Sequence, residues 1–572
     1  VGLAWSGRLD PPINRKRSCP PALISQLLDL PGITFVSLQK EISSGFELND
    51  PRLLDLSGDL LDFHHTAALI SLLDLVITID TSIVHLAGTL GRPAWLLLPF
   101  VPDWRWHLDR DDSPWYPSIR LFRQQSRGEW QSVITRTMLE LASRLPDSAC
   151  ILNDCGVLAE ARGASSDALY FYQKALEYDP DLSITWYNMG NSLKHMGRIN
   201  ESRDCYEEAL RLRPDFPEAH HNLAIVARDM GDITAACRHC EAALSLNPDF
   251  ADALHTMGEL HQHEERFGEA VEAFKRAIAA DPLSARSWNS LGIARQSLEL
   301  DSEAEPCYRE ALRLDPGHLH ARNNLGAVLL TLGRVDESIQ VLKTLVDMAP
   351  DYHDGRWNLA CSLIAAGEWD RGWEEFEFRF LKHSPVQLPQ SDLPLWDGSP
   401  LNGRGILIQG EQAFGDVIQF IRFAASVAAR GGIVHVVCQH HALTKFAGMA
   451  DGVSTAHNPS DPLPDDIVCR VPIMSLPHVL GMTLDQLPAT VPYMTVPADL
   501  LTAWHAKIPK DAVGIRVGIC WSGRQTLRNR RRSCPPDLLS ILGDIPGVSM
   551  FSLQIGGTPP PPGLNLIDLT DD

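Results

Sequence analysis

A proline recurs every 34 residues through the middle of this 572-residue chain. Proline ends an α-helix because it has no amide hydrogen to donate and its ring clashes with the preceding turn. A fixed period of this length indicates an array of helical units that stack on their neighbours to bury a continuous apolar core. The period therefore predicts an α-solenoid of about seven repeats over residues 146–383. The prolines are Pro146, Pro180, Pro214, Pro248, Pro282, Pro316 and Pro350.

Two further positions recur with the prolines. Ten residues after each proline stands a glycine or an alanine, which lets the two helices of one repeat approach closely. Seventeen residues after each proline stands a glycine in five repeats, but Glu265 and Glu299 in the other two. Glycine favours the left-handed turn at a helix end, so the two glutamate repeats must turn without that help. This pattern resembles the tetratricopeptide repeat, which implies a superhelix with a concave face for a peptide or protein.

Asparagines recur at one offset within the repeats, at Asn188, Asn222 and Asn324. Asparagines on the inner helices can grip a peptide backbone, and we predict this role for all three. The alternative is that they are solvated polar residues or make local helix contacts. The repeat pattern does not separate the two interpretations.

The segment that opens the chain is present again near its end. Residues 1–39 and residues 517–554 share the runs WSGR, RSCPP and SLQ, and they differ by one residue in length. We therefore divide the chain into residues 1–145, 146–383, 384–512 and 513–572, the last being a second, truncated copy of the start of the first. This order suggests a piece of a longer tandem protein. The alternative is a circular permutation, in which residues 1–145 complete an enzyme with residues 400–510.

Residues 1–145 alternate short apolar strands with helices. We expect strands at Val1–Trp5, Thr34–Leu38, Leu75–Asp80 and Ala94–Leu98. Such alternation predicts a parallel sheet with helices on both faces. Ligands of these sheets bind at the carboxyl ends of the strands, often against the N-terminus of a helix.

One stretch, DLVITIDTSIVHLAGTLGRPAWLLLP, has this arrangement. Asp80 ends a predicted strand, and Thr81 or Ser82 can cap the following helix, whose first turn carries His85. Backbone amides at residues 81–83 would suit a pyrophosphate. The stretch resembles the donor-binding segment of glycosyltransferase family 9, the heptosyltransferase-like enzymes of the two-lobed GT-B type. The resemblance implies that these four residues line a nucleotide-sugar pocket, with Ser82 in place of the family's usual glycine. A packed helix histidine is the alternative for His85.

A second candidate cluster is WSGR followed by NRKRS. It follows the first predicted strand, and its glycine permits close approach to a phosphate. Its arginines could neutralise a departing diphosphate, which needs fixed positive charge, although a solvated basic loop is the alternative. A similar basic cluster recurs at residues 528–532. We assign to the donor site Trp5, Ser6, Gly7, Arg15, Arg17 and, as a candidate contact to the nucleobase, Gln39.

Residues 384–512 begin another unit of strand, glycine-containing loop and helix. The Gly-Asp-Val-Ile run at Asp416 resembles the first motif of the same family's N-terminal lobe. The resemblance implies that Asp416 is the catalytic base, with Glu411 as the nearby alternate. Transfer with inversion needs a base that takes the acceptor's proton. The alternative is that Asp416 caps a helix starting at Val417.

Composition excludes some classes of function. The net charge of −22 argues against bulk nucleic-acid binding, and no apolar run is long enough to span a membrane. Twelve scattered cysteines and no visible signal peptide fit a reducing cytoplasm. We predict α/β Rossmann-like GT-B lobes flanking the solenoid, an inverting cytoplasmic glycosyltransferase of bacterial type without metal or cofactor, and a protein or peptide in the repeat groove. The alternative is an interaction scaffold with degenerate transferase lobes.

Overall fold

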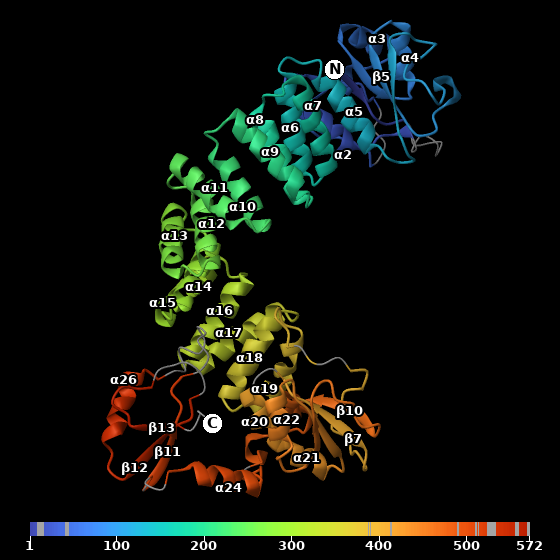
Figure 1. Ribbon diagram of the computed structural model, residues 1–572. Coiled ribbons are helices and arrows are strands. Elements are labelled where there is room, and N and C mark those ends of the chain that lie inside the picture. The colour runs from blue at the N-terminus through green and yellow to red at the C-terminus, as the bar shows by residue number, and fades with distance from the viewer. Residues whose placement is uncertain are drawn as a thin grey trace. The chain divides into compact units, whose positions relative to one another are not determined.

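The computed structural model describes residues 1–7, 17–40, 45–386, 388, 391–411, 414–488, 491–509, 512, 514–522, 534–554 and 560–568. It divides into two compact units, Val1–Leu260 and His261–Asp572. Each unit contains helices of the repeat array and at least one parallel sheet (Figure 1). Within the described ranges, no helix is long and apolar enough to cross a membrane.

The first unit opens with a six-stranded sheet in which every neighbouring pair is parallel. The strand order is β3-β2-β1-β4-β5-β6. Strands lie at all four places where the sequence predicts them, and β3 and β6 are additional. The strands are β1 (Gly2–Ala4), β2 (Phe35–Ser37), β3 (Leu53–Asp55), β4 (Val76–Ile79), β5 (Ala94–Leu98) and β6 (Ile119–Arg123).

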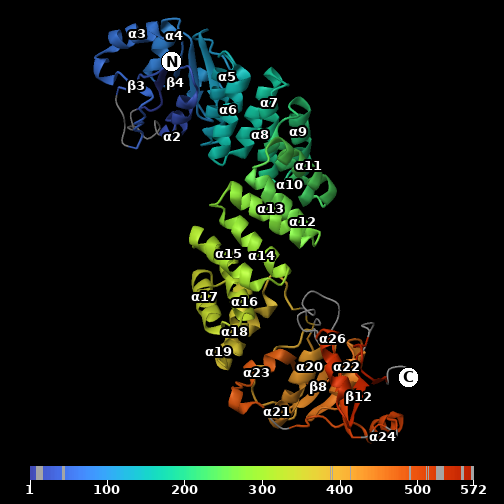
Figure 2. The same cartoon turned by 90° about the vertical axis from the view of Figure 1, so that its left-hand side faces the viewer.

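Helices cover both faces of this sheet, as Figure 2 shows. One face packs against α2 (Pro21–Ile24) and α5 (Gln131–Ala142), and its core continues into the first repeat. The other packs against α3 (Phe63–Leu72) and α4 (Ser82–Thr89). Because successive strand residues point to opposite faces and both faces are covered, all residues of the central strands β1, β4 and β5 are buried, as in the sequence VITI of β4.

The repeats form pairs of antiparallel helices, as the proline period predicts. In one pair a Cβ added to Gly190 would lie 2.7 Å from the ring of Tyr206, so only a very small residue permits this helix contact. The helices are α6 (Ser148–Ala161), α7 (Ser165–Tyr178), α8 (Ser183–His195), α9 (Ile199–Leu212), α10 (Pro217–Asp229), α11 (Ile233–Leu246), α12 (Ala251–His263), α13 (Phe267–Ala280), α14 (Ala285–Ser297), α15 (Asp301–Leu314), α16 (Leu319–Thr331), α17 (Val335–Met348), α18 (His353–Ala365) and α19 (Trp369–Phe376).

The turn between the two helices is the same in the repeats with and without glycine. Gly231 has a φ of 83°, and Glu265 and Glu299 have φ values of 57° and 65°. The glutamates therefore adopt the left-handed conformation too, which costs a side-chain-bearing residue about 1 kcal/mol. Packing of the two flanking helices offsets this cost.

The second unit contains a four-stranded parallel sheet of order β10-β7-β8-β9. Its core includes Trp373 and Phe376 of α19, so the last repeat helix packs on the sheet. The strands are β7 (Gly405–Gln409), β8 (Ile433–Val437), β9 (Val453–His457) and β10 (Ile467–Pro472), and the helices are α20 (Phe414–Phe420), α21 (Ala424–Ala429), α22 (His441–Ala447), α23 (Leu476–Val479) and α24 (Ala498–Lys507).

The second copy of the opening segment forms a separate three-stranded sheet. Its strands are β11 (Ile515–Ile519), β12 (Val548–Ser552) and β13 (Leu566–Asp568), all parallel and in the order β11-β12-β13. A short helix, α26 (Pro536–Leu539), connects the first two strands.

Candidate functional site

The six-stranded sheet reverses its strand order between β1 and β4. The chain runs from β1 through β2 to β3 on one side, then crosses to β4 and continues to β6 on the other. In open parallel sheets, ligands bind outside the carboxyl ends of the strands at such a reversal. Trp5, Ser6 and Gly7 directly follow β1, and Asp80 directly follows β4. Residues from two separate sequence motifs therefore meet at this point.

An ion pair joins the two motifs. Arg17 Nη1 lies 3.2 Å from Asp80 Oδ2, with the aspartate side chain 6% and the arginine side chain 29% exposed. Both residues line a cavity of about 660 Å³, which we call the switch-point cavity. Arg15, the other predicted cation, lies outside the described residues.

Two segments that follow the last two strands complete the cavity, and sequence reasoning missed the second of them. Residues 99–103 follow β5, and residues 124–130 follow β6 and contribute Arg127, a second exposed cation. Gln124 shapes this wall, since its Oε1 accepts from the amides of Phe100 at 3.2 Å and Gly128 at 3.0 Å. The strand-end rule would have found residues 124–130 if β6 had been recognised, but its alternation IRLFR is short.

Gln39, for which the sequence predicts a contact to a nucleobase, makes hydrogen bonds to the backbone of its own sheet. Its buried Oε1 accepts from the amides of Trp5 at 3.2 Å and Ser6 at 3.0 Å, and its Nε2 donates to the Ser6 carbonyl at 2.8 Å. Gln39 therefore clamps the loop after β1, which favours a structural role. Trp5 is buried in the sheet core as well, and its Nε1 donates to the Phe46 carbonyl. The Gly7 amide donates to Ser18 Oγ at 3.3 Å.

The start of α4 follows the predicted capping pattern. Thr81 is the N-cap, and its Oγ1 accepts from the amide of Ile83 at 3.3 Å. Ser82 begins the helix with its side chain exposed. His85 faces a different cavity, where its ring stacks on Trp106 at 5.5 Å between centroids and its Nδ1 lies 3.3 Å from the Tyr116 hydroxyl. The structure thus brings Asp80 and Arg17 together but places His85 elsewhere.

Glu411 and Asp416 follow β7 in the second unit and differ in their surroundings. Arg379 donates from Nε and Nη2 to the two carboxylate oxygens of Glu411 at 3.0 and 2.9 Å, and both side chains are almost fully buried. The amide of Met474 also donates to Glu411. Such a carboxylate is held in place, so the geometry favours a structural role. Asp416 is half-buried within the first turn of α20, which begins at Phe414 rather than at Val417.

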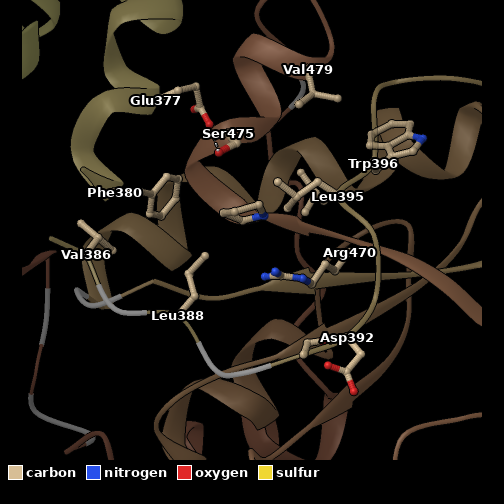
Figure 3. A pocket seen from close by; sticks show the side chains of 13 residues that line it. Glu377, Phe380, Val386, Leu388, Asp392, Leu395, Trp396, Arg470, Ser475 and Val479 are labelled. Carbon is tan, nitrogen blue, oxygen red and sulfur yellow. Dashed lines mark hydrogen bonds between the residues drawn. The ribbon is translucent and has the colours of Figure 1, made fainter. Parts of the chain in front are cut away.

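A second cavity, of about 600 Å³, lies beside this ion pair (Figure 3). Ser475 donates to Glu377 at 2.9 Å on one wall. The Arg470 side chain extends along the opposite wall, where its Nη1 donates to Gln409 at 2.9 Å. The Ser475 bond therefore joins the segment after the last repeat helix to the segment after β10, whereas the Arg470 bond joins β10 to β7 within the sheet.

The three candidate asparagines make hydrogen bonds between neighbouring repeats. Asn188 donates to Asn153 at 3.0 Å, and Asn324 donates to Asn289 at 3.0 Å, each over a separation of 35 residues. Asn222 donates to Asn191 at 2.8 Å. All three are half-buried. Their amide hydrogens thus stabilise the stacking of repeats, a contact that sequence reasoning did not consider.

Candidate metal ligands do not gather in the residues the structure describes. Among these, no group of three or more His, Cys, Asp or Glu side chains is placed to hold an ion.

The family models that match this chain describe its repeats. Family models of the tetratricopeptide repeat match residues 183–216, 215–282, 285–318 and 302–353. Protein FlbA of Caulobacter vibrioides is 33% identical over 159 residues, which cover 26% of this chain and 25% of FlbA. The chain thus matches about a quarter of the length of that relative.

Two solved structures are each similar over about a third of the chain. The MamA protein is 24% identical and covers 30% of this chain and 94% of its own, with a TM-score of 0.28. YrrB, described as a TPR protein with an unusual peptide-binding site, is 23% identical over 32% of this chain and 94% of its own, with a TM-score of 0.28. From the family matches we conclude that residues 183–353 are tetratricopeptide repeats, a repeat type that indicates protein–protein interaction.

Proposed function

We propose that this chain belongs to a glycosyltransferase that takes a sugar from a nucleotide-sugar bound in the switch-point cavity. The repeats bind a protein partner or substrate. The transfer is inverting and needs no metal, as the family 9 resemblance implies. The observation that carries the proposal is the Arg17–Asp80 pair in a cavity at the reversal of the sheet.

The order of the sheet supports a nucleotide ligand. Read along the sheet it is 3-2-1-4-5-6, the order of doubly wound sheets that bind dinucleotides across the same reversal. The volume of about 660 Å³ lies within the range of small-molecule sites. A nucleoside diphosphate with one sugar would occupy most of it.

The arginines that line the switch-point cavity support a diphosphate as part of its ligand. Arg17 and Arg127 supply two cations from different segments of the wall, which also carries the carboxylates of Asp80 and Asp103. Asp80 holds Arg17 in one orientation, so less side-chain entropy is lost when the ligand binds. Fixed cations also stabilise the negative charge that develops on a departing diphosphate.

Fewer observations support the catalytic base that we predict in the second unit, where the acceptor would bind. Asp416 remains the candidate catalytic base, because it follows a strand end and is half-buried in the first turn of α20, whereas Glu411 is held in a fully buried ion pair. Its role is a prediction from the resemblance alone. Glu411 is the weaker candidate, since using it as a base would break a buried ion pair.

The second candidate function is an interaction scaffold. The matched tetratricopeptide repeats favour it, because they indicate a protein partner whether or not the sheets bind a ligand. A scaffold would leave the switch-point cavity without a specific ligand. Donor binding therefore separates the two functions.

The test is thermal unfolding of the full chain with UDP, GDP, ADP and their sugar-bearing forms. A ligand at 100 times its dissociation constant adds about 2.7 kcal/mol to the free energy of unfolding of the unit that binds it. We expect one nucleotide class to raise the melting temperature, and Asp80→Asn to abolish the shift by releasing Arg17.

The matched control is Asp112→Asn, because Asp112 also pairs with an arginine, Arg110, but is exposed and outside the cavity. It should leave the shift intact. A melting temperature unchanged by every nucleotide would overturn the proposal in favour of the scaffold.

A further inference from the structure

A second, smaller cavity on the first unit is lined largely by aromatic side chains. Its volume is about 330 Å³. We call it the aromatic pocket, and it is formed by His85, Trp104, Arg105, Trp106, Trp115 and Tyr116. None of these residues lines the switch-point cavity.

Two of its tryptophans present their rings to solvent. Trp104 is 70% and Trp115 is 58% exposed, and their rings meet edge to face at 6.4 Å with an angle of 84°. Exposed indoles are costly to hydrate, and adjacent pairs of them mark binding sites. Their mutual orientation leaves the ring faces at right angles, as two walls of one corner.

The walls are held in place by charged neighbours. The Arg105 guanidinium lies 5.0 Å from the centre of the Trp104 ring, and its Nη1 donates to Asp103 at 2.8 Å. Asp103 also caps the short 3-10 helix Trp104–Trp106. The exposed ring is therefore preorganised rather than a mobile surface side chain.

The floor of the pocket is rigid and polar at its edge. Trp106 is buried and stacks on His85, whose ring contacts Tyr116. Gly88 of α4 lies under Tyr116, where an added Cβ would come within 2.5 Å of the tyrosine ring. The imidazole of His85 and the hydroxyl of Tyr116 thus sit at fixed positions beside the exposed indoles.

We propose that the aromatic pocket binds one pyranose ring of a carbohydrate. A pyranose has an apolar C–H face that packs on an indole and hydroxyl groups around its edge that need hydrogen-bond partners. His85, Arg105 and Tyr116 supply such partners, and the volume is at the lower end for ligand sites, which suits a single ring.

Other ligands fit this corner less well. A quaternary ammonium would meet the positive charge of Arg105, which lies over one face of Trp104, whereas a sugar can stack on the other face and accept a hydrogen bond from the guanidinium. A nucleobase held between two aromatic rings needs them parallel, but these two rings are nearly perpendicular. The chemistry at the walls therefore favours a sugar.

The pocket adds a second ligand to the proposed function without depending on it. Residues 99–106 contribute Asp103 to the switch-point cavity and Trp104 to Trp106 to the aromatic pocket. One loop thus carries walls of both, but a free sugar can bind whether or not a nucleotide does. Failure of one proposal leaves the other standing.

The experiment is saturation-transfer NMR and calorimetry on the full chain with methyl glycosides of glucose, galactose, mannose, rhamnose and N-acetylglucosamine. We expect at least one glycoside to bind, and Trp104→Ala and Trp115→Ala each to weaken it about tenfold, which corresponds to the loss of one stacked ring face. The control is Trp504→Ala, because Trp504 is also exposed and also has a cation, Lys507, over its ring.

The outcomes are distinct. A glycoside that binds the wild type and Trp504→Ala but not Trp104→Ala supports the proposal, and UDP binding unchanged by Trp104→Ala would keep the two sites separate. Binding of tetramethylammonium or a proline-rich peptide in place of every glycoside would overturn it. So would the absence of glycoside binding, or equal loss in all three tryptophan variants.

Discussion

The chain carries the same segment twice, and the two copies differ in what surrounds them. The first copy, residues 1–39, lies in a sheet of six strands; the second copy, residues 517–554, lies in a sheet of three. Both pair their first two strands in parallel with corresponding registers, Gly2 opposite Val36 and Gly518 opposite Phe551. The segment therefore determines its own strand pairing.

The clamp on the loop after the first strand is also common to both copies. Gln554 Oε1 accepts from the amides of Trp521 at 3.2 Å and Ser522 at 3.0 Å, and its Nε2 donates to the Ser522 carbonyl at 3.0 Å. These contacts repeat those of Gln39 almost distance for distance. A shape that two separate sheets reproduce is encoded locally.

The two copies differ in how far the end of their second strand is buried. Leu38 is 2% exposed, whereas its counterpart Leu553 is 60% exposed. Leu38 belongs to a core with residues of α3, β4 and α4, and the described part of the second copy has no counterpart of β4. The loop shape is thus local, but the core and the switch-point cavity require the strands that follow.

We expect the largest difference in the free energy of unfolding when the corresponding leucines, Leu38 and Leu553, are replaced. Leu38→Ala should lower the free energy of unfolding of the first sheet by about 3 kcal/mol, because it empties a buried site. Leu553→Ala should change the second sheet by less than about 0.5 kcal/mol. Hydrogen exchange of peptides covering β1 and β11 measures both, and equal effects would break the comparison.

We expect a smaller difference in the free energy of unfolding when the two clamp residues, Gln39 and Gln554, are replaced. Gln39→Ala leaves two buried amides and a carbonyl without a partner and should cost about 2 kcal/mol, while the more exposed Gln554→Ala should cost about 1 kcal/mol. Amide exchange at Trp5 and Trp521 reports each clamp separately. A larger loss in the second copy would contradict local encoding.

The sequence predicts the repeats well because their information is periodic. Each proline and each small residue acts within one repeat, so the same pattern is read seven times. Glu265 and Glu299 show the limit, because their left-handed turns depend on the helices around them rather than on the residue itself. The inter-repeat bonds of Asn188 and its equivalents also depend on a contact 35 residues away.

The candidate site is predictable only in part for a related reason. Asp80 was found from its place at a strand end, and its partner Arg17 from a basic cluster, but their contact spans 63 residues. We assign Gln39 to the nucleobase from its place after a predicted strand, and His85 to the same pocket as Asp80 from the family resemblance. Side-chain direction decides both, since Gln39 turns to the backbone of its own sheet and His85 turns to Trp106.

The most direct test of the account is hydrogen exchange of the full chain with and without the nucleotide that gives the largest thermal shift. We predict protection in peptides covering residues 76–85 and 98–103, at the ends of β4 and β5, and none in residues 515–522 of the second copy. Protection confined to the repeats, or equal in both copies, would contradict a nucleotide site that depends on the Asp80 side of the sheet.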